Sequence, residues 1–329
     1  MVRAALALST LLFTALPVHA SQASRAPAAL TVVSTAPAGE IATLAEANEI
    51  RIVFSEPMVT LGRIPAVVRA PFFKIAPAVS GTFRWSGPTI LIFTPDPKKP
   101  LPYATAYEVT IDTTATAVSG RTLARPVSFR FTTPTVKLLS TEWYRRGNNV
   151  ANDIVVLLRF NQPVRSADVA AHAKAALEPH DWTAPSFSAE EQARLKAADP
   201  QALDRFAAKV AATRAVSQAT TAVGLRPTTD WDKKRYPVSR DLVVLETTTA
   251  VQPESWVQLT VDGTVPSPAG AATPGKDQSF TIQVEPAFFI DGFYCRAECD
   301  PDAWNPVRMR REVNVKAFAA SLTAVDITA

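Results

Sequence analysis

A strand-like phrase that occurs twice constrains the fold of this chain more than any other feature. It reads IRIVFSEPMV at residues 50–59 and IVVLLRFNQPV at residues 154–164. Each copy ends in Phe, two polar residues and a proline, and the phenylalanines, Phe54 and Phe160, are 106 residues apart. Because proline lacks the N–H that a strand donates to its neighbour, each strand is expected to end or bulge at Pro57 or Pro163. The spacing is that of one small β-sandwich domain.

Further segments repeat in the same order. TILIFTPDPKKPLPYATAYEVTID at residues 89–112 corresponds to DLVVLETTTAVQPESWVQLTVDG at 241–263, and VSFRFTT at 127–133 corresponds to SFTIQVEP at 279–286. These segments alternate apolar and polar residues, which is typical of strands with one face on a core and one in water. With 27 prolines and only 11 glycines, the chain is predicted to be all-β, with two copies of an antiparallel Ig-like sandwich in tandem.

The repeat sets the expected domain boundaries. We predict a first sandwich at residues 21–135, a second at 136–287, and the start of a truncated third at 288–329. A partial sandwich leaves edges unpaired, so either the chain is a fragment of a longer polypeptide or the assignment of a third sandwich is wrong.

The second copy is longer than the first because of an insertion near residues 186–216. Ser188 followed by Glu191 forms a capping-box pattern, and Pro200 separates two short helical stretches. The insertion is interpreted as a helical cover over one end of the sandwich, with a lid or a partner-docking arm as the alternative.

The N-terminus has the features of a secretory signal. MVRAALALSTLLFTALPVHA has a basic start, a short apolar run and small residues before Ala20, so cleavage after Ala20 is predicted. An uncleaved anchor is the alternative. No later stretch has the length of a membrane span, so a periplasmic or secreted protein is expected.

The two cysteines, Cys295 and Cys299, are predicted to form a disulfide. An exported protein meets an oxidising compartment, where a lone pair of cysteines favours a bridge. A zinc site needs about four ligands, and the remaining histidines are distant in sequence. A thioredoxin-type site needs two intervening residues rather than three.

No catalytic motif is present in the sequence. His172 and His180 are candidates to pair with Asp181, but both lie in segments typical of a surface helix and turn. We therefore expect no enzyme activity, no cofactor and no metal. The acidic run at residues 299–302 could supply oxygen ligands to calcium, but it lacks the ligand spacing of a calcium loop. The net charge of +4 is spread along the chain and gives no reason to expect nucleic acid or a membrane surface as a partner.

Two groups of aromatic residues are candidate ligand contacts. Residues 230–241 combine Trp231, Tyr236 and several cations, which fits a polyanion or glycan contact as well as a solvated loop. Phe83 and Trp85 lie on one face of a strand, where a core pair is the favoured reading and a sugar-stacking platform is the alternative.

In order, these motifs resemble the N-terminal macroglobulin-like domains of bacterial alpha-2-macroglobulins. The resemblance is carried by residues 32–59, 72–112, 154–164 and the paired cysteines in FYCRAECDPDAWNPVRM. It implies the scaffold of a secreted or periplasmic protease trap, with target proteases and envelope proteins as partners. Neither cysteine is followed by Glu-Gln, so the thioester chemistry of that family does not transfer to any residue here.

Two functions are therefore expected to compete. The first is the non-catalytic N-terminal scaffold portion of an alpha-2-macroglobulin-like inhibitor. The second is a free-standing exported Ig-like module that binds glycan or another envelope protein, which requires exposed aromatic rings at Phe83, Trp85 or Trp231. The sequence leaves the oligomeric state open.

Overall fold

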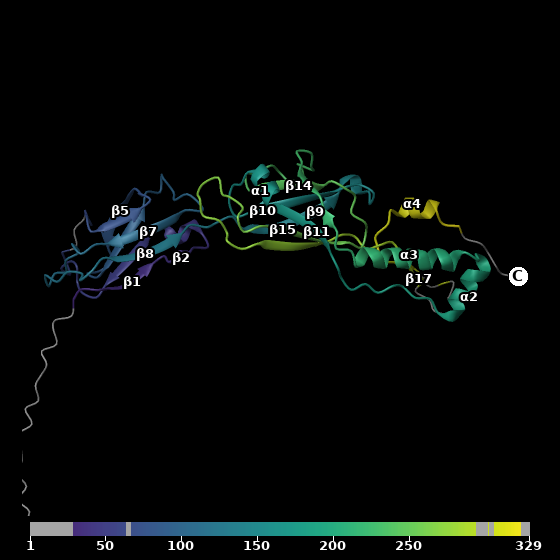
Figure 1. Ribbon diagram of the computed structural model, residues 1–329, viewed down its shortest axis with the longest axis horizontal. Coiled ribbons are helices and arrows are strands. Elements are labelled where there is room, and N and C mark those ends of the chain that lie inside the picture. The colour runs from purple at the N-terminus through teal and green to yellow at the C-terminus, as the bar shows by residue number, and fades with distance from the viewer. Residues whose placement is uncertain (1–28, 64–66, 294–301, 303–305, 324–329) are drawn as a thin grey trace, which may run out of the picture.

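Eight strands of the N-terminal part of the chain form two four-stranded sheets around one core. The computed structural model describes residues 29–63, 67–293, 302 and 306–323 (Figure 1). The elements of this first sandwich are β1 (Val32–Ala36), β2 (Gly39–Glu40), the 3-10 helix η1 (Leu44–Ala47), β3 (Ile50–Phe54), β4 (Phe73–Ala76), β5 (Gly81–Trp85), β6 (Ile90–Pro95), β7 (Ala106–Ile111) and β8 (Val127–Thr132). The strand orders are β1-β3-β6-β5 in one sheet and β2-β8-β7-β4 in the other.

The core of the first sandwich follows from the alternation in its strands. In β3, Ile50, Ile52 and Phe54 are buried, while Arg51 between them is exposed. Phe73 and Phe93 stack between the sheets with ring centroids 5.1 Å apart. Side chains of period two from both sheets therefore meet in one apolar layer, as the sequence pattern predicts.

A second sandwich follows. Its elements are β9 (Leu138–Arg145), the 3-10 helix η2 (Arg146–Asn148), β10 (Ile154–Phe160), α1 (Ser166–His172), β11 (Ala173–Glu178), β12 (Ala222–Val223), β13 (Leu225–Pro227), β14 (Leu242–Thr247), β15 (Trp256–Val261) and β16 (Gln278–Gln283). The strand orders are β13-β14-β10-β9 and β12-β11-β15-β16. The two sandwiches lie one after the other along the long axis of the molecule (Figure 1).

The two sandwiches share one topology. The order β1-β3-β6-β5 recurs as β9-β10-β14-β13, and β8-β7-β4 recurs as β16-β15-β11. Thr110 and Ser128 join their hydroxyls across β7 and β8 at 2.8 Å, and Thr260 and Ser279 do the same across β15 and β16 at 2.8 Å. The predicted fold of tandem antiparallel Ig-like sandwiches is confirmed.

The predicted helical insertion in the second sandwich is confirmed as well. It consists of α2 (Ala189–Ala198) and α3 (Ala202–Ser217), which flank Pro200. Ser188 caps α2, because its hydroxyl accepts from the Glu191 N–H while the Glu191 carboxylate accepts from the Ser188 N–H. Both helices lie beyond the end of the second sandwich that is remote from the first (Figure 1).

The described part of residues 288–329 contains two short strands and a helix. β17 (Ile290–Phe293) pairs antiparallel with β18 (Val307–Met309), and α4 (Val315–Ala320) follows. The domain boundaries, including the start of a third sandwich, remain predictions.

A short junction joins the sandwiches through main-chain contacts. Ala104 donates its N–H to the Pro134 carbonyl at 3.0 Å and accepts from the Ala272 N–H at 2.8 Å. Gln162, buried to 2% exposure, donates to the same Pro134 carbonyl at 3.1 Å. A Cβ atom at Gly270 would lie 2.3 Å from the Ala104 carbonyl oxygen, so only glycine fits this close approach.

Candidate functional site

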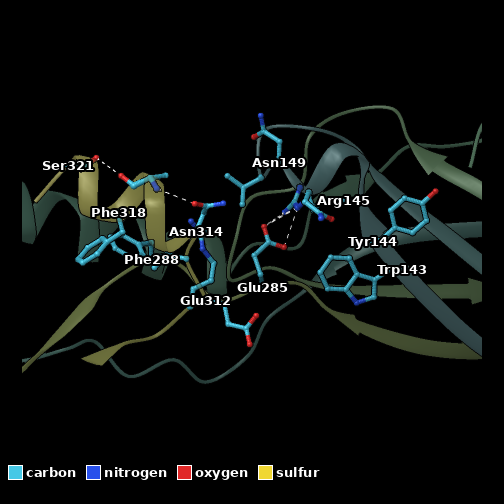
Figure 2. Close-up of a pocket in the computed structure, with 15 residues that line it drawn as sticks. Trp143, Tyr144, Arg145, Asn149, Glu285, Phe288, Glu312, Asn314, Phe318 and Ser321 are labelled. Atoms are coloured by element: carbon cyan, nitrogen blue, oxygen red, sulfur yellow. Dashed lines mark hydrogen bonds and ion pairs between the residues drawn. The ribbon is translucent and has the colours of Figure 1, made fainter. Parts of the chain in front are cut away.

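A cleft of about 970 Å³ separates the end of the second sandwich from the α4 segment (Figure 2). One side consists of Trp143 and Arg145 from β9, Asn149 from the following loop, and Glu285 from the segment after β16. Phe288, Glu312 and the α4 residue Phe318 belong to the opposite side (Figure 2), and Arg311, which lies over the Phe288 ring, also lines the cleft. The cleft therefore has polar and aromatic groups on both sides, as a binding surface for another chain requires.

A buried ion pair stands on the sandwich side of the cleft. The Arg145 side chain is 5% exposed and that of Glu285 is 17% exposed. Arg145 Nε donates to both Glu285 carboxylate oxygens, at 2.9 and 3.2 Å, and Nη1 donates to the Asn152 carbonyl at 3.0 Å. A charge removed from water is tolerated when it is paired and hydrogen-bonded in this way. The pair fixes the end of β9 to the segment that follows β16.

Two cations lie over the Phe288 ring at the opposite side of the cleft, whose lining also includes one carboxylate, Glu312 (Figure 2). Lys209 of α3 lies 5.2 Å from the Phe288 ring centroid, and the Arg311 guanidinium lies 5.8 Å from the same centroid. Burial, followed by the charge of Arg311, lowers the pKa of Lys209. Among the described residues no carboxylate lies within ion-pair distance of either cation. A carboxylate from another molecule would relieve the repulsion between them.

The helical insertion is attached to this region through aromatic rings. Phe289, which is 3% exposed, lies between Trp182 at 5.8 Å and Phe206 of α3 at 6.1 Å. Arg310 adds a hydrogen bond from its N–H to the Phe289 carbonyl. The insertion is thus packed against the segment that carries β17 and β18, and through it against the cleft.

A second polar cleft is lined by η2, the end of β9 and the loop after β13. Arg146 bridges Asp230 and Glu246, and Arg226 donates to Glu246 at 2.7 Å. Burial raises the pKa of Glu246, but hydrogen bonds from Arg226 and Arg146 outweigh it and leave this pKa below its usual value. These groups satisfy one another and hold the loop after β13 in place.

The loop at residues 230–241 is packed on the outer face of the β10-β14 sheet. Tyr236 is buried at 6% exposure and stacks on Tyr144 with centroids 6.0 Å apart. Trp231 donates its indole N–H to the Tyr236 carbonyl at 2.8 Å, and Lys233 covers its ring at 4.9 Å. The aromatic rings of this loop therefore serve its packing, and the face of Trp231 is not open as a glycan platform.

The Asp181 carboxylate pairs with neither histidine, although the His180 Nδ1 lies 3.2 Å from the main-chain carbonyl oxygen of Asp181. His172 Nδ1 contacts the Asp262 carboxylate at 3.0 Å, and Thr264 donates to the same carboxylate at 2.6 Å. His180 stacks on Trp256 with centroids 4.4 Å apart. Both histidines hold strand ends together in this structure.

Phe83 and Trp85 face the core. Phe83 lies 5.2 Å from the Phe73 ring and 5.0 Å from Phe93, and Trp85 lies 6.2 Å from Phe54. The favoured reading of a core aromatic pair is confirmed by these contacts. Both rings are partly exposed and pack against the core, which does not favour a sugar-stacking platform at this strand.

Several predictions fall on residues outside the described part of the chain. They are the signal sequence at residues 1–20, the Cys295–Cys299 disulfide, and most of the acidic run at residues 299–302. Within the described ranges, no three His, Cys, Asp or Glu side chains come together as metal ligands. No helix in those ranges combines the length and apolar character that crossing a bilayer requires.

The cleft itself was not found from the sequence. Arg145 and Glu285 are separated by 140 positions, and neither belongs to a motif. The available signal was the repeat: aligning Phe54 with Phe160 places Pro37 of the first copy opposite Trp143 of the second. The two copies therefore differ in residue type at this position of the strand.

Comparison with known proteins agrees with the fold. Residues 26–133 match the family model of the bacterial Ig-like domain. No curated protein matches the chain. A solved structure of native alpha-2-macroglobulin from Escherichia coli, spanning domains MG0-NIE-MG1, is 9% identical over 82% of this chain and 75% of that chain, with a TM-score of 0.24. A match at this score carries no argument about this chain.

Proposed function

We propose that this chain is a non-catalytic scaffold of an exported, macroglobulin-like protease inhibitor. The observation that carries the proposal is the junction between the sandwiches. A scaffold must hold successive modules at a fixed angle, and here the Ala272 N–H donates to the Ala104 carbonyl while Gly270 packs closely against the same carbonyl.

Two further features support a scaffold. The sandwiches repeat one topology, so one set of contacts serves for stacking modules. The Ig-like match covers residues 26–133, and domains of this kind act in larger assemblies through their surfaces. Export follows from the predicted signal at residues 1–20 and is part of the proposal.

The test is made on the native polypeptide in the exported fraction. Immunoblotting gives its location and size, and incubation with an added endopeptidase followed by gel filtration shows whether the protease is retained. A trap predicts that the polypeptide is cut at a limited site and that the protease co-elutes with it. A protease that elutes free overturns the inhibitor proposal.

The competing function gives a different result in a second assay. Purified protein that binds cell-wall glycan, without retaining protease, would identify an exported binding module. The packing of Phe83 and Trp85 against core rings, and of Lys233 over the Trp231 ring, counts against that outcome.

A further inference from the structure

The two sandwiches differ at one sheet edge. In the first, β2 covers the outer edge of β8 in parallel, with Gly39 opposite Phe131 and Glu40 opposite Thr132. The Ile41 N–H then donates to the Thr132 carbonyl at 3.0 Å, and Ile41 is 2% exposed. The chain thus closes this edge with its own short strand.

In the second sandwich the same edge is open. Thr132 pairs with Ala106 as Gln283 pairs with Trp256, so β16 takes the place of β8. β16 pairs with β15 alone. Because the Val284 N–H donates to the Ser255 carbonyl, the main chain of Gln283 and Thr281 points away from β15. In the described part of the chain, the outward-facing N–H and C=O groups of Thr281 and Gln283 have no hydrogen-bond partner. Both residues are exposed.

The sequence explains the difference. Pro37 ends β1, because it cannot continue the ladder, and the chain crosses to the other sheet as β2. The corresponding residue of the second copy is Trp143, which continues β9 as far as Arg145. No segment is left to cross over to β16, and the half-buried Trp143 ring faces the cleft beside Glu285 (Figure 2).

We propose that the open edge of β16 is a docking site for an extended segment of a partner protein, which pairs in parallel with residues 281–283 as β2 pairs with β8. Strand addition of this kind supplies affinity through main-chain hydrogen bonds and specificity through alternate side chains. The partner segment places an apolar residue at the position of Ile41, which is 2% exposed in the first sandwich.

The charges around the cleft indicate an acidic segment. Arg311 lines the cleft and Lys209 lies beside it over the same Phe288 ring, so two cations stand against one unpaired carboxylate of the described lining, Glu312, while Arg145 is already paired with Glu285. In the first sandwich the strand that fills this edge also carries an acid, Glu40, which meets Lys137 at 3.1 Å. A partner acid near Arg311 would occupy the comparable place.

The first sandwich supplies the probe. A synthetic peptide with the sequence of residues 37–45, PAGEIATLA, is added to the mature protein, and hydrogen exchange of the amides at residues 281–283 is followed. Binding is expected to slow this exchange by about tenfold, because the Gln283 N–H becomes paired. A peptide with proline in place of the isoleucine, which lacks the donating N–H, is expected to give no protection.

Two variants separate main-chain pairing from other causes. Gln283→Pro removes the outward N–H, which an edge position tolerates, and is expected to abolish peptide protection with little change in Tm. Gln283→Val, the matched control, keeps the N–H and is expected to retain it. Equal loss in both variants would indicate side-chain recognition and overturn strand addition.

The remaining outcomes also decide the proposal. Absence of protection at millimolar wild-type peptide contradicts it, whether or not the proline variant folds. Light scattering that shows a dimer of the mature protein, converted to monomer by Gln283→Pro, assigns the edge to a second copy and overturns the partner segment. These results do not depend on whether the protein inhibits a protease.

Discussion

At the scale of single residues, the cleft depends on one buried charge pair. Arg145 is the last residue of β9 and Glu285 follows the end of β16, a strand of the other sheet, and no other described carboxylate contacts Arg145. A buried pair of this kind does not by itself add much stability. The loss of one partner, however, leaves the other charge buried without a partner.

Replacing Glu285 with alanine tests this dependence. We expect Glu285→Ala to lower the free energy of unfolding by about 3 kcal/mol, because Arg145 remains buried without its partner. Urea denaturation measures the loss. Glu190→Ala, which breaks the exposed pair with Arg194, serves as the control and is expected to cost less than about 1 kcal/mol. Equal effects would contradict the assignment of Arg145 as a buried charge.

Asp262 gives a pH-dependent prediction. Hydrogen bonds from the Thr264 hydroxyl and N–H, together with His172, lower the pKa of Asp262 from 3.8 to about 2. A carboxyl with a depressed folded-state pKa stabilises the protein above its unfolded pKa, and this contribution is lost as the pH falls toward the folded value. Asp262→Asn is therefore expected to lower Tm at pH 7, with the difference from wild type shrinking between pH 4 and pH 2.

Thermal unfolding at several pH values checks this result. Asp181→Asn is the control, because Asp181 is the exposed carboxylate that sequence reasoning placed beside the histidines. It is expected to leave Tm unchanged. A pH-independent effect of Asp262→Asn would show that the charge of Asp262 is not what the neighbouring groups stabilise.

At the scale of elements, the helical insertion combines local and tertiary determinants. α2 buries none of its residues, so its stability rests on local interactions such as the Ser188 capping box. α3 is held instead by packing, since Phe206 contacts Phe187 and Phe289. The two helices should therefore respond differently to changes in the cap.

Removing the cap is expected to affect α2 alone. Ser188→Ala deletes the acceptor for the Glu191 N–H and should destabilise α2 by about 1 kcal/mol. Hydrogen exchange in α2 is then expected to accelerate, with exchange in α3 and the Tm of the sandwich unchanged. Ser186→Ala, two residues earlier and outside the capping box, is the control. Acceleration in α3 as well would mean that the insertion behaves as one cooperative unit.

At the scale of the whole molecule, the relative position of the sandwiches depends on one close contact. The loop that carries Gly270 reaches from the second sandwich to Ala104 of the first, and Ser267 donates to Gln162 at 2.8 Å behind it. Because these contacts are short and largely buried, the junction is expected to restrict bending.

Gly270→Ala is expected to release this restriction. The added methyl group would overlap the Ala104 carbonyl, so the loop must withdraw while both cores stay intact. Small-angle scattering should show a broader distribution of interatomic distances, and circular dichroism should show unchanged strand content. Ala271→Ser, an exposed neighbour, is expected to leave the scattering unchanged. Identical scattering for Gly270→Ala would indicate that other contacts fix the junction.

The repeated module, its alternating strands and the helical insertion could all be predicted from the amino-acid sequence. Each depends on signals within about ten residues: alternating side chains, a proline that ends a strand, and Ser188 with Glu191. The core positions of Ile50, Ile52 and Phe54 follow from the same alternation.

The cleft, the junction and the open edge of β16 depend on contacts that exist only in the folded chain. Arg145 meets Glu285, and Ala104 meets Gly270, across long stretches of chain, and pairings at such separation leave no periodic trace in a single sequence. The open edge arises because Trp143 extends β9 where Pro37 ends β1. Which neighbour a strand edge meets depends on the path of the chain in space, so the same repeated pattern closes one sandwich and leaves the other open.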